Sequence, residues 1–385
     1  MEEVGVIGVG KLGLCMALIL ENVGYSVKCY DKNEGLAEAI STKSLESIEP
    51  RVSEMLKRST NISVFKSLSD IYRLKSIFIV VATPSLSNGS YNHSAVEEVI
   101  DTILELNSQT PDYNEKLLVV SCTTMPGYCD TVQERLNKYN YRVCYNPEFI
   151  AQGNIVDGLV KPDMVLIGHT SSTASESLSK IYNAFLKNSP PVKMMSRTEA
   201  EITKIALNCF LTTKIAFANM IGDIVVKAGG NPSIVLNAIG SDTRVGNKFL
   251  KWGHGFGGPC LPRDNRALSY FSKTIHIDHE IGETTDQSNK KHLKYLLDYI
   301  VSLNKDNKPI VFNSVVYKEG THILEESQKL ELALLCRNTG LDVSIYDNPT
   351  VINQLKSIYG GTFKYLDHLT DEQIKDYFSV DAYIN

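Results

Sequence analysis

Residues 4–13 read VGVIGVGKLG, an apolar run that breaks into three glycines and leads into the helix-like stretch LCMALILENVG. Gly8, Gly10 and Gly13 have the G-x-G-x-x-G spacing. Between a strand and a helix, the first glycine allows a tight turn, the second lets a pyrophosphate approach the backbone, and the third lets the helix pack closely. The free N–H groups at the helix start can then bind phosphate. The stretch therefore predicts an α/β fold with a dinucleotide-binding turn.

The next predicted strand, YSVKCYD, ends at Asp31, which follows Gly13 by eighteen positions. A carboxylate in this place binds the ribose hydroxyls of NAD and repels the 2′-phosphate of NADP. We therefore expect NAD as the cofactor. The alternative is a glycine turn in some other kind of α/β protein.

Strands alternate with helices through the first half of the chain, which predicts a parallel sheet with helices on both faces. We assign residues 1–195 to an N-terminal Rossmann-type domain. From residue 198 a proline-free helical period runs to Gly229-Gly230, and a helix of about thirty residues spans about 45 Å. It opens a central helical region, 196–300, expected to hold a dimer interface and active-site groups. The α/β pattern returns in residues 301–385, a smaller C-terminal Rossmann-like domain.

Composition excludes several classes of partner. The net charge of −5 gives no basic footprint, so we expect no nucleic-acid partner. We see no signal peptide, and no apolar run approaches the roughly 18 residues of a membrane span, so we expect a cytoplasmic protein without membrane contact. The eight cysteines are scattered and form no C-x-x-C pair, which disfavours a metal site or a disulfide framework.

One cysteine, Cys260, has unusual neighbours in the sequence. Residues 255–264 read GFGGPCLPRD, so Cys260 lies among glycines and prolines that a helix or strand core would not tolerate. This predicts a shaped loop. A thiol becomes a nucleophile when a nearby cation or dipole lowers its pKa, and Lys204 could supply the charge. The alternative is a buried, inert cysteine, which is the commoner fate of the residue.

Three further polar residues are candidates for chemistry. Lys204 and Asn208 lie four positions apart on the predicted long helix, which places them on one face. The alternative for this pair is a solvated polar edge. Glu148 stands in NPEFIAQG directly after an apolar strand. It could act as a general base or orient a water, or it could be an ordinary glutamate of a surface loop.

Taken together, these residues resemble the UDP-glucose 6-dehydrogenase family, within the wider nucleotide-sugar 6-dehydrogenases. The resemblance covers roughly residues 1–275 and continues weakly to the end. Its most specific parts are NPEF, RVGNKFLKWGHGFGGPCLPRD, and Lys204 with Asn208. It implies that NAD oxidises the C6 hydroxyl of UDP-glucose to an aldehyde, which a cysteine captures as a thiohemiacetal. A second NAD then oxidises this adduct to a thioester, and water releases UDP-glucuronate.

The resemblance also assigns roles to individual residues. Its catalytic set is Cys260 as nucleophile, Lys204 and Asn208 as the oxyanion-stabilising pair, Glu148 for acid–base work, Asp264 beside the cysteine, and Thr124 as holder of the catalytic water. Its cofactor-binding set is Gly8, Val9, Gly10, Lys11, Leu12, Gly13, Asp31, Thr83, Pro84, Thr124, Gln152 and Arg263. Its substrate-binding set is Glu148, Phe149, Lys204, Asn208, Arg244, Lys248, Lys251, Phe256, Gly257 and Lys318. The family takes the arginine matched by Arg244 from the neighbouring subunit, which implies a homodimer that could assemble further.

The chain departs from the family pattern mainly at cofactor contacts and in the last domain. The departures are Lys11-Leu12 in place of Tyr-Val, Leu36 in place of a basic residue, Gln152 in place of a second glutamate, and Glu325 near the place of an arginine. The FK loop survives as Tyr317-Lys318. We expect these changes to weaken NAD binding without abolishing the chemistry.

Three other functions remain open on the sequence. The substrate could be GDP-mannose or a UDP-N-acetylhexosamine, although the GNKFLK run favours UDP-glucose. A single-oxidation β-hydroxyacid dehydrogenase shares the domain plan and the lysine–asparagine pair, but it does not need Cys260. A degenerate nucleotide-sugar binding protein would explain Gln152, Leu36 and Glu325, but the retained catalytic set argues against it.

Overall fold

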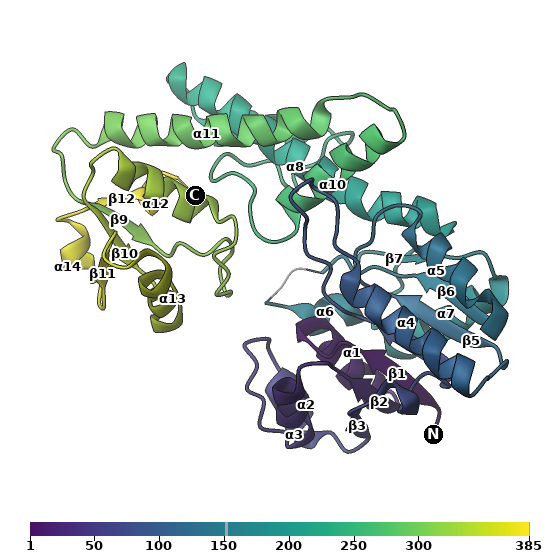
Figure 1. Cartoon of the computed structure of the whole chain (residues 1–385). Coiled ribbons are helices and arrows are strands. Elements are labelled where there is room, and N and C mark those ends of the chain that lie inside the picture. Colours follow the sequence, from purple (N-terminus) through teal and green to yellow (C-terminus); the bar gives the residue numbers. More distant parts are fainter. Residues whose placement is uncertain (151–152, 385) are drawn as a thin grey trace. The chain divides into compact units, whose positions relative to one another are not determined.

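A computed structural model describes residues 1–150 and 153–384 (Figure 1). The predicted cofactor residue Gln152 lies outside the described residues. The chain divides into two compact units, Met1–Lys204 and Ile205–Asn385, and the boundary falls inside the long helix α8, Arg197–Lys227. Most of the expected central region and the whole of the expected C-terminal domain therefore belong to the second unit.

The first unit is built on an eight-stranded sheet of order β3-β2-β1-β4-β5-β6-β7-β8. The strands are β1 Glu3–Ile7, β2 Ser26–Tyr30, β3 Ile62–Phe65, β4 Ser76–Ile79, β5 Lys116–Val120, β6 Tyr141–Tyr145, β7 Val165–Gly168 and β8 Val192–Met195. Their pairs are parallel except for β6 and β7, which meet antiparallel at Tyr145 and Gly168. The prediction of a parallel sheet is wrong at this pair. Strand direction depends on the path of the connection, which local residue patterns do not encode.

Helices cover both faces of this sheet, as the alternating pattern predicted. They are α1 Lys11–Asn22, α2 Glu34–Ser41, α3 Val52–Arg58, α4 Ser94–Gln109, α5 Tyr128–Leu136, α6 Ile155–Val160 and α7 Ser172–Phe185. Successive strand residues point to opposite faces. On β1, Val4 and Val6 accordingly join the core beneath α1, whereas Ile7 joins the core beneath α4 with Ile100. Apolar runs buried on both faces are what a central strand requires.

The second unit combines helices with a small parallel sheet of order β11-β10-β9-β12. The strands are β9 Ile310–Asn313, β10 Val343–Tyr346, β11 Lys364–Leu366 and β12 Phe378–Ser379. The helices after α8 are α9 Pro232–Gly240, α10 Leu261–Thr274, α11 Ile281–Leu303, α12 Gln328–Asn338, α13 Pro349–Tyr359 and α14 Asp371–Ile374. Leu296, Ile310, Leu332 and Ile345 bring α11, β9, α12 and β10 into one apolar core. The predicted α/β pattern of the last residues is therefore present.

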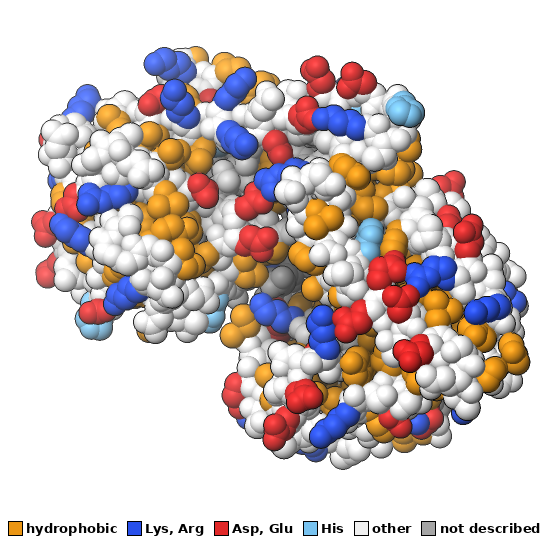
Figure 2. Space-filling view, viewed as in Figure 1, with side chains coloured by type: hydrophobic (Ala, Val, Ile, Leu, Met, Phe, Trp, Pro, Cys, Tyr) orange, Lys and Arg blue, Asp and Glu red, His pale blue; other side chains and the backbone are white. Residues whose placement is uncertain are grey.

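Helix α8 has 31 residues, which confirms the long helix expected there. By length and hydropathy alone it is also apolar enough to cross a membrane, so the expectation that no apolar run approaches such a span is wrong by this measure. Four large apolar side chains on α8 are exposed, namely Phe210, Phe217, Met220 and Ile224. On the face of the molecule shown in Figure 2, acidic and basic side chains are interspersed.

Candidate active site

The glycine turn after β1 has the geometry that its spacing predicted. Gly8 has a φ of +87°, and a Cβ there would lie 2.5 Å from the carbonyl oxygen of Val80. A Cβ on Gly13 would lie 1.8 Å from the carbonyl oxygen of Gly8. A Cβ on Gly10, by contrast, would meet no atom within 4 Å. Backbone packing therefore requires the first and third glycines, and the second leaves space beside the start of α1.

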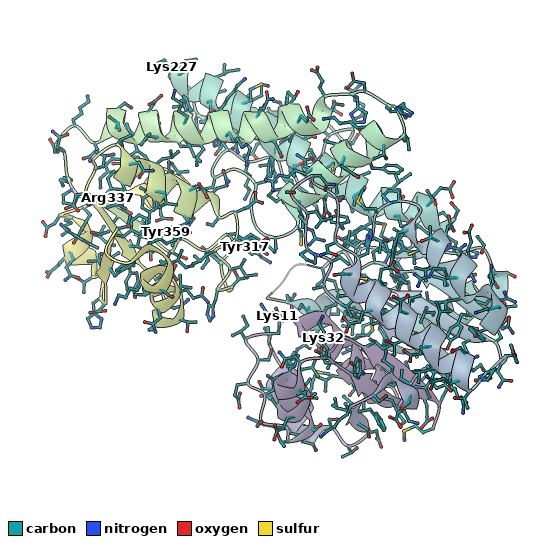
Figure 3. The ribbon with its side chains drawn as sticks, viewed as in Figure 1. Lys11, Lys32, Lys227, Tyr317, Arg337 and Tyr359 are labelled. Carbon is teal, nitrogen blue, oxygen red and sulfur yellow. The ribbon has the colours of Figure 1, made fainter. Side chains whose placement is uncertain are left out.

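Asp31 follows β2 and is tied to this turn. One of its carboxylate oxygens accepts the backbone N–H of Val9 at 2.8 Å, and the other accepts that of Asn33 at 2.9 Å. A cavity of about 430 Å³ adjoins the turn and is lined by Gly8, Gly10, Asp31, Lys32 and Pro84 among others. Figure 3 labels Lys32 and Lys11, the first residue of α1. A carboxylate for ribose and free helix N–H groups for pyrophosphate make this cavity fit a dinucleotide.

The other expected cofactor residues of the first unit differ in exposure. Thr83 is buried and its hydroxyl donates to the carbonyl of Thr123 at 2.7 Å, whereas Pro84 lines the cavity. Leu12 packs against the core of the sheet. Leu36, which stands where a cation was expected, packs against the same core and donates its N–H to the side chain of Asn33.

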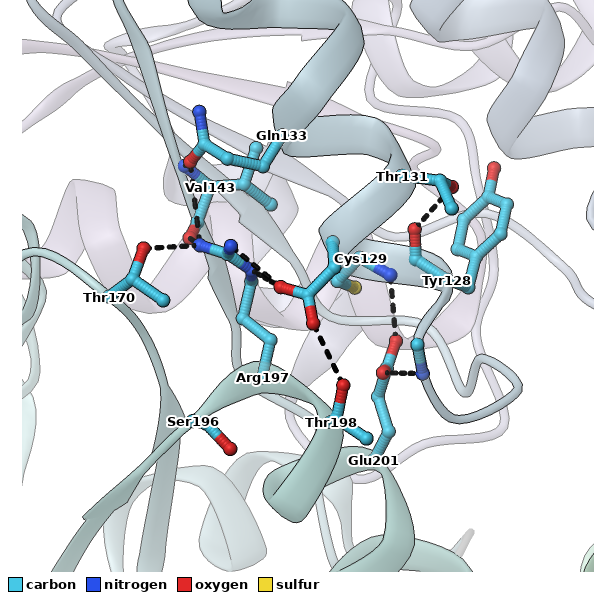
Figure 4. A network of polar contacts seen from close by, with 12 residues as sticks. Tyr128, Cys129, Thr131, Gln133, Val143, Thr170, Ser196, Arg197, Thr198 and Glu201 are labelled. Carbon is cyan, nitrogen blue, oxygen red and sulfur yellow. Dashed lines mark hydrogen bonds and ion pairs between the residues drawn. The ribbon is translucent and has the colours of Figure 1, made fainter. Parts of the chain in front are cut away.

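Thr124 belongs to a buried network at the start of α8, and Figure 4 shows the part of this network around Glu201. Glu201 is fully buried, and its carboxylate accepts the hydroxyl of Thr124 at 2.8 Å and the backbone N–H groups of Gly127 at 2.6 Å and Cys129 at 2.9 Å. Burial raises the pKa of Glu201 above its ordinary value, and these bonds oppose the rise. Sequence reasoning missed Glu201, although it precedes Lys204 by three positions on the same helix.

The same figure shows how the first turn of α8 is anchored to α5. Arg197 contacts the carboxylate of Asp130 at 2.6 Å, and the hydroxyl of Thr198 donates to that carboxylate at 2.8 Å. Arg197 also donates to the carbonyl of Val143 at 3.2 Å and to the hydroxyl of Thr170 at 2.9 Å. These contacts hold the start of α8 against the sheet of the first unit.

Glu148, three residues beyond the end of β6, contacts Lys204 and Tyr182. The ammonium of Lys204 donates to the backbone carbonyl of Glu148 at 2.7 Å and lies 4.6 Å from the ring centre of Phe149, within cation–π range. The hydroxyl of Tyr182 contacts the carboxyl of Glu148. Desolvation raises the pKa of Glu148 to about 7, against opposing contributions from Tyr182 and Lys204. A carboxyl that titrates near neutral pH is suited to acid–base work.

Cys260 differs from every other cysteine of the chain. All eight cysteines are among the described residues, and of these Cys260 alone is exposed. Burial raises the pKa of thiols such as Cys15 and Cys336 to about 12, which keeps them protonated. Cys260 instead occupies the N-cap position of α10. The free N–H groups and dipole at a helix start favour negative charge there, and the expected shaped loop is present.

Asp264 and Asn208 meet in the second unit beside the same helix start. The side-chain amide of Asn208 donates to the carboxylate of Asp264 at 2.7 Å. Asp264 is buried, its N–H donates to the carbonyl of Cys260 at 3.0 Å, and Arg263 lies 3.5 Å from its carboxylate. The structure therefore brings together Asn208, Cys260, Asp264 and Arg263 in the second unit. Thr124, Glu148 and Lys204 belong to the first.

The glycine-rich loop before Cys260 is held from both sides. Asn289 of α11 accepts the N–H of Phe256 at 3.0 Å and donates to its carbonyl at 2.8 Å, while the phenyl ring is buried. A Cβ on Gly257 would lie 2.1 Å from the carbonyl oxygen of Glu326, and one on Gly258 would lie 2.3 Å from the ring of Tyr317 (labelled in Figure 3). The two glycines are therefore required by close packing against the segment after β9.

Contacts of His292 with Asp223 and Gly253 fix the start of this loop. One ring nitrogen of His292 lies 2.8 Å from the carboxylate of Asp223, and the other lies 2.6 Å from the carbonyl oxygen of Gly253. Contacts at both ring nitrogens fix the orientation of the imidazole. The indole of Trp252 donates to Asp223 at 2.8 Å. No sequence signal pointed to this pair, since its members lie 69 positions apart.

The expected basic substrate contacts lie on the surface. Lys248, Lys251 and Lys318 are exposed, as is Arg244, whose guanidinium pairs with Asp242 at 2.7 Å. Glu325 is exposed too, and its neighbour Glu326 forms two hydrogen bonds of 2.7 Å with Arg266. Within the part of the chain that the structure describes, no group of three His, Cys, Asp or Glu side chains could hold a metal ion.

Comparison with known proteins agrees with this geometry. The family model of the UDP-glucose/GDP-mannose dehydrogenase NAD-binding domain matches residues 2–186, and that of the central domain matches residues 198–291. A UDP-glucose 6-dehydrogenase of Rickettsia bellii is 30% identical over 371 residues, covering 94% of this chain and 84% of the relative.

Two solved structures are also similar. A UDP-glucose dehydrogenase from the archaeon Pyrobaculum islandicum superposes with a TM-score of 0.85 at 27% identity, covering 96% of this chain and 86% of the other. A UDP-D-ManNAc dehydrogenase from Pyrococcus horikoshii superposes with a TM-score of 0.78 at 25% identity, covering 90% and 83%. The similar proteins thus act on different nucleotide sugars.

Proposed function

The chain belongs to the UDP-glucose/GDP-mannose dehydrogenase family, and we propose that its own reaction is the NAD-dependent oxidation of UDP-glucose to UDP-glucuronate. The family membership makes it an NAD-binding nucleotide-sugar dehydrogenase. The choice of UDP-glucose rests on the GNKFLK run and on the similarity of the chain to relatives named UDP-glucose dehydrogenases.

The observation that carries the proposal is the exposed thiol of Cys260 at the start of α10. An alcohol-to-acid oxidation releases four electrons and so needs two hydride transfers. After the first, the sulfur adds to the aldehyde carbon and the carbonyl oxygen takes up a proton. Loss of the second hydride from that carbon and of the proton from its hydroxyl leaves a thioester, and water then releases the carboxylate and restores the thiol. The covalent adduct keeps the aldehyde bound between the two oxidations.

The remaining polar residues supply proton transfer and charge stabilisation. Glu148 exchanges protons near neutral pH, consistent with the raised pKa of its carboxyl. Lys204 and Asn208 provide a fixed cation and a fixed amide for developing negative charge on oxygen. Thr124 has its hydroxyl proton committed to Glu201, so its oxygen is oriented to accept a hydrogen bond from the hydrolytic water.

The cofactor site proposed here consists of the glycine turn, the start of α1 and Asp31. NAD supplies the acceptor for each hydride when it is bound. The Gly10 position leaves room for the pyrophosphate, and the carboxylate of Asp31 binds the ribose hydroxyls. A carboxylate there favours NAD over NADP.

A homodimer forms part of the proposal. Phe210, Phe217, Met220 and Ile224 recur along α8 at spacings of seven, three and four, which places them on one helix face, and between 43% and 63% of each is exposed. A contiguous exposed apolar stripe is typical of an interface. Arg244, with 87% of its side chain exposed, is free of the core and can reach a partner subunit.

Counting NADH per substrate tests the proposal. UDP-glucose, GDP-mannose and a UDP-N-acetylhexosamine are each supplied in limiting amount with excess NAD. The proposed function requires two NADH per UDP-glucose and slower reaction with the other sugars. One NADH per substrate favours the single-oxidation reaction, a better alternative sugar reassigns the substrate, and binding without NADH formation identifies a degenerate binding protein.

A further inference from the structure

Asn146, the residue after β6, is held in one orientation. Its backbone N–H donates to the carbonyl of Val120 at 2.9 Å, and its side-chain NH₂ donates to the carbonyl of Leu166 in the antiparallel strand β7 at 2.8 Å. The side chain is buried, with 1% of its surface exposed. Because the NH₂ end is fixed by Leu166, the amide oxygen must face the other way, toward α7.

On that side the amide oxygen of Asn146 meets the hydroxyl of Tyr182 at 2.6 Å. The same hydroxyl contacts the carboxyl oxygen of Glu148. Tyr182 and Asn146 are both buried, so bulk water does not compete at their contact, whereas Glu148 is half-buried. A phenol has one proton and can donate it to one acceptor at a time, yet both neighbours of this hydroxyl are acceptors when Glu148 is ionised.

Counting protons shows which state of Glu148 satisfies the cluster. If Glu148 is protonated, its carboxyl donates to Tyr182, and Tyr182 donates to Asn146, so every donor has an acceptor. If Glu148 is ionised, Tyr182 turns its proton to the carboxylate. The amide oxygen of Asn146 then faces the phenol oxygen without a proton between them. A buried acceptor without a donor is unfavourable, so the amide of Asn146 works against ionisation of Glu148.

We propose that Asn146 and Tyr182 are positioning residues that set the proton on Glu148, with Asn146 favouring the protonated carboxyl and Tyr182 favouring the ionised one. The inference deepens the proposed function and rests on Glu148 as its acid–base group. Tyr182 from α7 and Lys204 from α8 are the titratable groups that act on this carboxyl, and desolvation outweighs both. The pKa of Glu148, about 7, reflects desolvation, which raises it, and the hydrogen bond with Tyr182 and the charge of Lys204, which lower it.

The consequence for the reaction is a group that can both take and return a proton at neutral pH. The proposed sequence removes protons during each oxidation and needs water activation at hydrolysis. A carboxylate with an ordinary pKa would accept protons poorly at neutral pH, and a fully neutral acid would not accept them at all. The Asn146–Tyr182 pair keeps the pKa of Glu148 between that of an ordinary carboxylate and that of a permanently neutral acid.

The test uses two variants that should shift the pKa of the Glu148 carboxyl in opposite directions. Asn146→Leu removes the competing acceptor, so Tyr182 donates to Glu148 without penalty, and the apparent pKa of the acid limb of kcat/KM should fall by about one pH unit. Tyr182→Phe removes the donor to the carboxylate, and the same apparent pKa should rise by about one pH unit. The protein is the full chain, assayed for NADH formation with UDP-glucose.

A buried tyrosine elsewhere in the same unit provides the matched control. Tyr141 of β6 is buried, accepts the side-chain NH₂ of Asn107 at 3.2 Å and donates to the carbonyl of Tyr72. Tyr141→Phe removes the same hydroxyl from a comparable asparagine–tyrosine contact away from Glu148. It should lower stability and leave the pH profile unchanged.

A second readout does not depend on turnover. Infrared difference titration follows the C=O band of a protonated carboxyl, and Glu148→Gln identifies the band of Glu148. The band should titrate at lower pH in Asn146→Leu and at higher pH in Tyr182→Phe. Shifts in the same direction, or no shift in Tyr182→Phe, would overturn the inference, and the tyrosine variant decides it alone if Asn146→Leu does not fold. Absence of NADH with every sugar would reject the proposed function, while the infrared titration still decides the proton arrangement.

Discussion

Thr124 donates its hydroxyl proton to Glu201 at 2.8 Å, across 77 positions of sequence. Glu201 also receives the N–H groups of Gly127 and Cys129 at the start of α5. The carboxylate thus caps one helix while it belongs to another, and it fixes the direction of the threonine hydroxyl. Any partner of Thr124 in the reaction must therefore act as a donor to it.

Glu201→Gln should separate orientation from stability. One carboxylate oxygen accepts Thr124 and the N–H of Cys129, and the other accepts the N–H of Gly127. An amide has a single oxygen and must turn its NH₂ toward one of these two sets of donors, so the carboxylate that fixes the Thr124 hydroxyl is lost. We expect kcat to fall by about 10²-fold with little change in KM, together with a lower Tm. Glu199→Gln, an exposed glutamate two positions earlier on α8, is the control and should leave kcat unchanged. A lower Tm with normal kcat would make Glu201 a helix cap only.

Cys260→Ala should stop the second oxidation more than the first. The first hydride transfer needs only a bound alcohol, a base and NAD, whereas the second needs a tetrahedral adduct. We expect far less than two NADH per UDP-glucose on the wild-type timescale. Cys260→Ser should accumulate a sugar ester, visible as added mass on the intact protein, because an ester hydrolyses more slowly than a thioester.

The exposure of Cys260 gives an independent check of the same assignment. Brief iodoacetamide treatment of the native protein should label one cysteine, and NAD with UDP-glucose should protect it. Cys336→Ser, a substitution at a buried cysteine of the same unit, should leave this labelling in place. Wild-type rate and stoichiometry in Cys260→Ala would instead make the cysteine structural and favour the single-oxidation reaction.

Asp31 should determine the choice of cofactor. Its carboxylate lines the dinucleotide cavity and would repel a 2′-phosphate. We expect wild type to turn over faster with NAD than with NADP. Asp31→Asn should raise the KM for NAD and reduce the difference in turnover between NAD and NADP. Glu34→Gln, which removes an exposed carboxylate three residues further along the chain, is the matched control for Asp31→Asn. Faster wild-type turnover with NADP would contradict the assignment.

The apolar stripe of α8 should hold two chains together. A charge at Phe217 would be buried without a partner in a dimer interface, so Phe217→Glu should yield monomers by light scattering. Because Arg244 is proposed to act in the partner subunit, these monomers should also lose activity. Ile358→Glu, at an exposed isoleucine of α13, should change neither property. An active wild-type monomer at assay concentration would rule the dimer out.

Glu148 should make stability depend on pH in a defined direction. Its folded pKa is raised to about 7 from an ordinary 4.5. A group of this kind contributes stability that is present below its unfolded pKa and lost as the pH rises through its folded pKa. Glu148→Gln cannot ionise, so relative to wild type it should gain about 2–3 kcal/mol of unfolding free energy between pH 4.5 and pH 8. Glu105→Gln, exposed on α4, should show no such gain, and equal curves for Glu148→Gln and wild type would contradict the raised pKa.

The local sequence determined those elements that depend only on interactions between residues close in sequence. The glycine spacing from Gly8 to Gly13 predicts a tight turn with close helix packing, and the structure has that turn. The uninterrupted helical period after residue 198 gave α8 to within a few residues. The glycines and prolines around Cys260 excluded a helix or strand interior, and the thiol is on an exposed loop end.

Tertiary structure decided whatever depends on groups that are distant in sequence. The direction of β7 relative to β6 follows from the route of the intervening chain, and residue alternation is the same for either direction. In the sequence, Glu201 is indistinguishable from the other polar residues of α8, and its role depends on the contact with α5 that the fold creates. The proton arrangement at Glu148 likewise needs Tyr182, 34 positions away, to stand between its carboxyl and Asn146. Hydrogen bonds are short and directional, so only the folded backbone can determine which donors and acceptors meet.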